Sequence, residues 1–155
     1  IDVAYLNFIS RCDKFQDEFC VILDRDIGSH SSEQLNDILR ICNEKGYKFF
    51  ITSPCFEFWL LLHLCDVQVK FAGKIENIQK NLKVSRKHSF VSDAVLKMAG
   101  HSKNISASVF KREYLPHVDD AIKQAEKFDT NICNLINNAS VGTNLADLIL
   151  LLRQS

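Results

Sequence analysis

The sequence predicts an α/β protein in which residues 1–65 form a partial parallel sheet with flanking helices and residues 66–155 are mainly helical. Two short apolar runs, 19–23 and 47–52, are separated by a stretch with helical periodicity, and a second helical stretch follows the second run. Strands and helices that alternate with short connections are typical of a parallel sheet covered by helices. Beyond residue 66 the segments become shorter and amphipathic, and helices are predicted there over about 115–128 and 144–153.

The first elements follow from the spacing of their apolar residues. Residues 1–12 carry apolar side chains at helical spacing, which predicts the end of a helix. The run 19–23 is almost continuously apolar, as expected of a strand that is buried on both faces. Ser31 or Ser32 can cap the following helix, which Gly46 ends.

Length and composition are those of a single folded domain over 1–155. Of the 155 residues, 46% are hydrophobic and 25% are charged, and 19 Lys and Arg balance 19 Asp and Glu. Because no overall charge favours nucleic acid, a membrane surface or an acidic protein, any such partner has to be held locally. No apolar stretch approaches the ~18 residues that span a bilayer. The 6 cysteines form no Cys-x-x-Cys pair and lie mostly in apolar runs, so we expect reduced thiols in a cytoplasmic protein.

Two acids stand where the first predicted strand ends. In "VILDRD" (21–26) the alternation of a strand puts Asp24 and Asp26 on one side and Arg25 on the other. Ligands of open α/β sheets collect at the carboxyl ends of strands, and paired carboxylates suit Mg²⁺ with its waters and a phosphate oxygen. Gly28 allows the backbone to turn close to this site. Solvation of a strand-to-helix turn is the simpler explanation of the same pair.

A third acid, Glu57, lies in "SPCFEFWLLLHL" (53–64), which follows the second strand. Pro54 is predicted at the first helical position, and the helix is apolar around most of its circumference, which is typical of a buried helix. With Ser53 as the cap, Glu57 misses the capping-box position by one residue. The helix dipole favours a carboxylate by only ~0.3–1 kcal/mol, less than the several kcal/mol that a buried unpaired charge costs. A metal ion or a basic group beside Glu57 is therefore expected.

Basic residues are the candidates for substrate binding. His63 lies about 120° around the helix from Glu57, so a packed core histidine is the first interpretation and a substrate contact the second. Arg25, Lys48 and the segment "SRKHSF" (85–90) can contact a phosphodiester backbone, although the segment is equally well explained as a solvated loop.

These segments together resemble the RloB-like family of bacterial proteins, which is associated with abortive infection and restriction-modification loci. The resemblance is carried in family order by 21–26, by 53–64, by "DAIKQAEKF" (120–128) and by "NNASVGTNLADLILLL" (137–152). The block Pro-Cys-Phe-Glu-x-Trp-Leu-Leu-Leu-His is highly specific. The last block is looser, because the family tends towards Asn-Pro-Ser-Thr where this chain has Asn-Ala-Ser-Val.

The resemblance implies a Toprim-like fold and Mg²⁺- or Mn²⁺-dependent phosphodiester chemistry. Asp24 and Asp26 would take the place of the Toprim Asp-x-Asp, and Glu57 that of the acid in the family's later motif, as catalytic and metal-binding residues. The family's first strand and its glutamate are expected to precede Ile1. The resemblance also implies a nucleic acid, DNA or RNA, as substrate and an AAA- or ABC-type ATPase encoded nearby as partner.

The leading hypothesis is thus a Toprim-like nuclease, or nuclease-like effector, of a bacterial phage-defence system. The alternative is a non-catalytic Toprim-like scaffold that binds the ATPase partner or a nucleic acid, which the neutral net charge and the absent glutamate favour. A phosphohydrolase of the haloacid dehalogenase type also carries a strand-end Asp-x-Asp, but that family usually has Thr or Val where Gly28 stands here.

Overall fold

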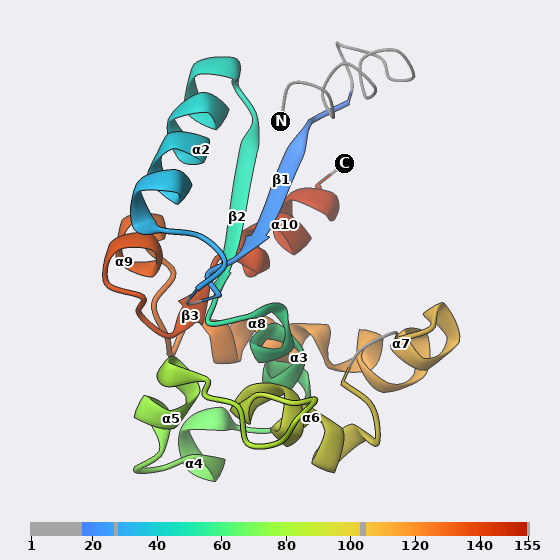
Figure 1. Cartoon of the computed structure of the whole chain (residues 1–155). Coiled ribbons are helices and arrows are strands. Elements are labelled where there is room, and N and C mark those ends of the chain that lie inside the picture. The colour runs from blue at the N-terminus through green and yellow to red at the C-terminus, as the bar shows by residue number, and fades with distance from the viewer. Residues whose placement is uncertain (1–16, 27, 103–104, 155) are drawn as a thin grey trace.

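The computed structural model describes residues 17–26, 28–102 and 105–154, so the helix predicted over 1–12 lies outside the described residues. Its elements are β1 (Cys20–Asp24), α2 (Ser32–Lys45), β2 (Lys48–Ser53), α3 (Phe56–Leu64), α4 (Val67–Lys70), α5 (Ile75–Lys80), α6 (Phe90–Ala99), α7 (Ala107–Glu113), the 3-10 helix η1 (Leu115–His117), α8 (Val118–Ala125), α9 (Ile132–Asn137), β3 (Gly142–Thr143) and α10 (Leu145–Leu152). Figure 1 shows a small sheet with a group of short helices below the carboxyl ends of β1 and β2. None of the described helices has the length and apolar character needed to cross a membrane.

The sheet is mixed rather than wholly parallel. β1 pairs parallel with β2, which confirms the expected strand–helix–strand unit, and Asp24 stands opposite Thr52 at its end. β3 pairs antiparallel with β2 and comes from the part of the chain that was predicted to be mainly helical. Its two residues are too few for a periodic signal. Gly142 is required there, because a Cβ at this position would collide with the backbone of Asp129.

A side chain extends the pairing of β2 beyond the end of β3. The Asn144 side chain accepts a hydrogen bond from the Ile51 N–H through Oδ1 at 2.7 Å and donates one to the Phe49 carbonyl through Nδ2 at 3.1 Å. Asn144 is buried, so its amide replaces backbone groups that a longer strand would have provided. α10 begins at the next residue, and the C-terminal segment is therefore tied to the middle of the sheet.

Helices cover both faces of the sheet. α2 and α9 pack on the face that carries Phe49 and Ile51, and α10 lies on the opposite face with Phe50 (Figure 1). On that second face the side chain of Ile22 in β1 remains 49% exposed. The expectation that 19–23 is buried on both faces is therefore wrong for the described residues, because α10 covers the sheet at β2.

The predicted limits of α2 are confirmed. The Ser31 side chain accepts a hydrogen bond from the Gln34 N–H at 3.2 Å, and Gln34 Oε1 accepts one from the Ser31 N–H at 2.9 Å. This reciprocal pair is a capping box. At the other end Gly46 adopts a left-handed conformation with φ of 72°, which glycine permits without a steric penalty.

α3 is the buried centre of the helical part and packs against α6 and α8. It begins at Phe56, with Cys55 as the N-cap residue, so the prediction that Pro54 opens the helix is wrong by two residues. Pro54 follows a cis peptide bond in the connection instead. The single helix predicted over 115–128 is likewise two elements, η1 and α8, and ends at Ala125.

Candidate functional site

Asp24 and Asp26 line one hollow at the carboxyl end of β1. The hollow has a volume of 390 Å³ and is also lined by Ser29, His30 and Phe56. Both acids are exposed to solvent. The structure thus places them on a common side, as strand alternation predicted, and beside a space large enough for a hydrated ion with a phosphate group.

The turn after β1 holds Asp26 by short-range hydrogen bonds. The Ser29 N–H donates to the Asp26 carbonyl at 3.1 Å, and the Ser29 hydroxyl donates to Oδ2 of the Asp26 carboxylate at 3.1 Å. Gly28 has φ of 114°, a conformation that favours glycine, so its predicted role in the turn is consistent with the backbone. The carboxylate of Asp26 therefore has a fixed neighbour on one oxygen and an open approach from the hollow.

Arg25 points to the opposite side and is buried, with only 9% of its surface exposed. Its Nε donates to the Ile136 carbonyl at 3.0 Å, its Nη1 to the His30 carbonyl at 3.2 Å and its Nη2 to the Ser32 hydroxyl at 3.0 Å. Such a planar fork suits Arg better than Lys. These contacts tie the loop after β1 to α9 and to the start of α2, which favours a positioning role for Arg25.

Glu57 approaches the same edge of the sheet from α3. It lies in the first turn of this helix, directly after the connection that follows β2, and is half-buried. The pKa of the neighbouring Cys55 thiol is raised by burial, by the Glu57 carboxylate, which also accepts a hydrogen bond from the thiol, and by the charge of Asp24. Asp24 and Glu57 therefore both act on Cys55 from this end of the sheet.

The described residues include no group of three or more His, Cys, Asp or Glu side chains that could hold a metal ion. Asp24, Asp26 and Glu57 are consequently not arranged as a ready three-ligand cage. Two carboxylates on an open hollow remain sufficient for Mg²⁺, which commonly takes one or two carboxylates and completes its shell with waters and substrate phosphates.

A family model for RloB-like proteins matches residues 6–152, nearly the whole chain. The chain belongs to the RloB-like protein family. No curated protein and no solved structure matches it.

In this RloB-like protein, Lys48 and His63, which were also predicted to contact substrate, lie away from the strand-end hollow. Lys48 is the first residue of β2, at the end of the strand away from Asp24, where it forms an ion pair of 3.7 Å with Glu18. His63 lines a different hollow, between the end of α3 and α8. The predicted substrate contacts are thus distributed over separate parts of the molecule.

The structure also brings to the strand-end hollow residues that sequence reasoning missed. His30 lines it together with Ile22 and Phe56, whose side chains are 49% and 42% exposed. The one sequence signal for this was that His30 follows Asp26 by four residues, within the same turn. Two large exposed apolar side chains beside two carboxylates give this RloB-like surface an amphipathic rim.

Proposed function

We propose that this RloB-like chain contributes the Asp-x-Asp half of a Mg²⁺-dependent, Toprim-like nuclease or nuclease-like effector in bacterial phage defence. One observation carries the proposal: Asp24 and Asp26 share a hollow at the carboxyl end of a parallel strand pair. That edge is where open α/β sheets bind their ligands. The family's association with abortive-infection loci adds the biological context.

The residues present fit a divalent cation. Both carboxylates are exposed to the hollow, and the Ser29 hydroxyl fixes one oxygen of Asp26 while leaving the other side of the group accessible. When bound there, Mg²⁺ would activate a water molecule and stabilise negative charge on a phosphate. Asp24 and Asp26 would hold the ion, His30 would face the substrate from the same hollow, and Arg25 would keep the loop in place.

Glu57 supports the site from the second strand end. Its carboxylate and that of Asp24 both raise the pKa of the Cys55 thiol, so acids from two consecutive strand ends converge on this edge. We therefore assign Glu57 to a second ion, to a water-bridged contact with the first, or to orientation of the attacking water.

The test is cleavage of DNA, RNA and tRNA by the chain with Mg²⁺ or Mn²⁺, alone and with the ATPase encoded beside it. Loss of an outer-shell partner alone reduces activity by ~10–100-fold in metal sites, so Asp24→Asn and Asp26→Asn should each reduce cleavage by about 100-fold or more. Asp147→Asn, an exposed acid on α10, is the matched control. Equal cleavage by wild type and both strand-end variants would remove the proposal.

A binding readout tests the same site without catalysis. Paramagnetic Mn²⁺ should broaden the backbone amide signals of residues 24–26 and 29–30 in wild type and leave them sharp in the Asp24→Asn, Asp26→Asn double variant. Broadening centred elsewhere would place the cation site outside this hollow.

The exposed rim of the hollow favours a second candidate, a scaffold that binds the ATPase partner without cutting nucleic acid. Ile22 and Phe56 are large apolar side chains on this rim, as expected of a protein-binding surface. In that case Ile22→Ser with Phe56→Ser would abolish co-purification with the ATPase and phage protection, while the Asp→Asn variants would protect like wild type.

A further inference from the structure

Positive charge is concentrated in residues 67–102, which comprise α4, α5, the connection 81–89 and α6 and are called the basic segment below. The basic segment carries seven Lys and Arg against two Asp and Glu, whereas the rest of the chain carries 12 and 17. Both of its acids are paired, Glu76 with Lys80 at 2.6 Å and Asp93 with Lys97 at 2.7 Å. The other cations of the segment form no ion pair with residues that the structure describes: Lys70, Lys74, Lys83, Arg86 and Lys87. A chain with no net charge therefore has a local positive field.

The connection 81–89 is a hydrogen-bonded hairpin. An antiparallel bridge between Lys83 and Ser89 closes it. Nearer the tip, the Val84 N–H donates a hydrogen bond to the His88 carbonyl at 3.0 Å. The exposed cations of this connection are therefore carried by an ordered backbone, which favours a binding surface over a loop that is merely solvated.

The hairpin begins beside the strand-end hollow. The Asn81 side chain donates a hydrogen bond through Nδ2 to Sγ of Cys55 at 3.5 Å. Cys55 is the N-cap residue of α3, and the next residue, Phe56, lines the strand-end hollow. Figure 1 shows α5 and α6, which flank the hairpin, below the carboxyl ends of β1 and β2. The base of the hairpin is thus fixed next to the edge that carries Asp24 and Asp26.

A hollow of 260 Å³ lies in the basic segment between α4 and α6, with Lys70 and Lys74 on its lining. The rings of Phe71 and Phe90 also line it, are partly exposed and have centroids 6.0 Å apart. Aromatic rings beside cations are the combination on which proteins stack the bases of a single strand while they bind its phosphates.

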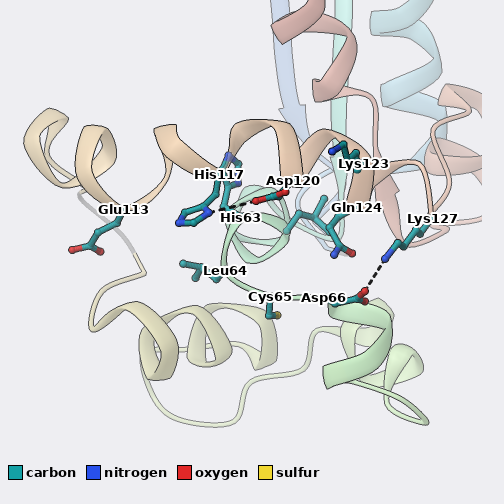
Figure 2. A pocket seen from close by; sticks show the side chains of 11 residues that line it. His63, Leu64, Cys65, Asp66, Glu113, His117, Asp120, Lys123, Gln124 and Lys127 are labelled. Atoms are coloured by element: carbon teal, nitrogen blue, oxygen red, sulfur yellow. Dashed lines mark hydrogen bonds and ion pairs between the residues drawn. The ribbon is translucent and has the colours of Figure 1, made fainter.

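The larger hollow between the end of α3 and α8, with a volume of 550 Å³, has no such excess of positive charge. Figure 2 shows Lys127 directed at Asp66, with which it forms an ion pair of 2.7 Å. His117 lies 3.5 Å from the Asp120 carboxylate, and Glu113 is a further acid on this lining. A polyanion would meet carboxylates there, so the basic segment is the better surface for one.

We propose that the basic segment binds a single-stranded nucleic acid, with one base in the hollow between α4 and α6 and phosphates on the cations that have no ion pair. A single strand presents phosphates and base faces together, whereas the bases of a duplex are stacked inside it. Such a strand also covers Leu82 and Val84, which are 68% and 51% exposed beside the hairpin cations. The choice of a nucleic acid over an acidic protein rests on the function proposed above, because the hairpin begins beside the hollow assigned to phosphodiester chemistry.

The first experiment measures the fluorescence anisotropy of labelled single strands of DNA and RNA, and of duplexes of the same sequence, with the whole chain in EDTA. The single strands should bind more tightly than the duplexes. The logarithm of the binding constant should fall by ~0.7 per bound phosphate for each tenfold rise in salt. Absence of binding at low salt, or tighter binding of the duplexes, would overturn the proposal. Tighter binding of poly-L-glutamate than of either strand would identify an acidic protein as the partner and overturn it as well.

Two double variants test the phosphate contacts on separate parts of the surface. Lys70→Gln with Lys74→Gln, and Arg86→Gln with Lys87→Gln, should each make the salt dependence shallower by about 1.4, because two phosphate contacts are lost. The matched control, Lys111→Gln with Lys123→Gln, removes the same charge at exposed positions outside the basic segment and should leave it unchanged. Equal salt dependence in all three proteins would contradict the assignment.

Replacement of one ring tests the base in the hollow. Phe71→Leu should weaken binding of the single strand by about fivefold or more and leave the salt dependence unchanged, because Leu keeps an apolar lining but offers no ring for stacking. Phe110→Leu is the control, since this partly buried ring stacks on Tyr114 in α7, outside the basic segment. Equal affinities of the two variants would place the base elsewhere and refute this part of the proposal.

One further variant separates this inference from the function proposed above. The Asp24→Asn, Asp26→Asn protein should bind the single strand in EDTA at least as tightly as wild type, because binding through the basic segment needs no metal ion. Lost cleavage with retained binding in this variant supports the binding surface. Lost binding would show that the strand is held at the strand-end hollow and would overturn the inference.

Discussion

Replacement of Arg25 by Met tests whether this residue holds the loop that carries the strand-end acids. All three kinds of guanidinium nitrogen donate within the protein, to the Ile136 carbonyl, the His30 carbonyl and the Ser32 hydroxyl, at 3.0–3.2 Å. Met has a similar length and no donor, so the variant removes these bonds without opening a large cavity.

The expected loss follows from the number of acceptors left without a partner. Hydrogen bonds to charged groups contribute ~1.5–3 kcal/mol each, and bonds that share one side chain are not additive. The Ile136 carbonyl retains the Ser32 hydroxyl as a donor at 3.1 Å, which leaves the His30 carbonyl as the main uncompensated group. We expect the free energy of unfolding to fall by about 2–3 kcal/mol, partly offset by burial of the Met side chain.

Urea denaturation followed by circular dichroism measures this change. With a slope of ~1–3 kcal/mol/M, the midpoint should fall by about 1–2 M. Arg25→Lys should recover less than half of the loss, because an ammonium group lacks the planar fork. Arg40→Met on α2 is the control: this exposed residue pairs with Glu44 at 2.8 Å, and such surface pairs contribute ~0–1 kcal/mol. An Arg25→Met protein as stable as Arg40→Met, with substrate binding lost, would refute the structural role and assign the guanidinium to the substrate.

Three further outcomes follow from single side chains. Asn144→Ala should lower the free energy of unfolding by about 2–4 kcal/mol in urea denaturation, because two buried backbone groups of β2 lose their partner, whereas exposed Asn43→Ala should change it by less than about 0.5 kcal/mol. Iodoacetamide at pH 8 should modify exposed Cys133 well before Cys55, since a raised pKa leaves the Cys55 thiol protonated; peptide mass spectrometry decides the order, and equal rates would contradict it. The NMR titration midpoint of His63 should lie below 6.5, because burial lowers its pKa. The unfolded state then binds the proton more readily than the folded state, so His63 lowers the stability of the protein as the pH falls below about 6.5. A midpoint above 6.5 would contradict a buried, neutral His63.

Local chemistry explains which parts of the fold could be predicted from the sequence. The cap at Ser31 and the helix end at Gly46 depend on residues close to them in the sequence. The parallel pair β1–β2 follows from two apolar runs with a helix between them. β3 could not be predicted, because its two residues owe their extended state to partners in β2 that lie far away in the sequence. The hydrogen bonds from the Asn144 side chain to β2 are tertiary contacts, and no local sequence pattern predicts them.

The candidate site divides in the same way. Alternation along a strand was enough to place Asp24 and Asp26 together and Arg25 on the other side. One partner of Arg25, the Ile136 carbonyl of α9, lies 111 residues later in the chain, so the burial of Arg25 could not be foreseen. His30 was missed because a turn residue has no periodicity, and its place on the hollow depends on how Arg25 holds the loop.

The link between β2 and Asn144 joins positions that are 93 residues apart in the chain. During synthesis, β1, α2 and β2 leave the ribosome long before this link can form. The sheet is therefore completed only when the segment with Asn144 has emerged, and until then the Ile51 N–H and the Phe49 carbonyl bind water in its place. A ribosome that stalls, or a message that is truncated, before Asn144 would thus leave the Ile51 N–H and the Phe49 carbonyl of β2 without this partner.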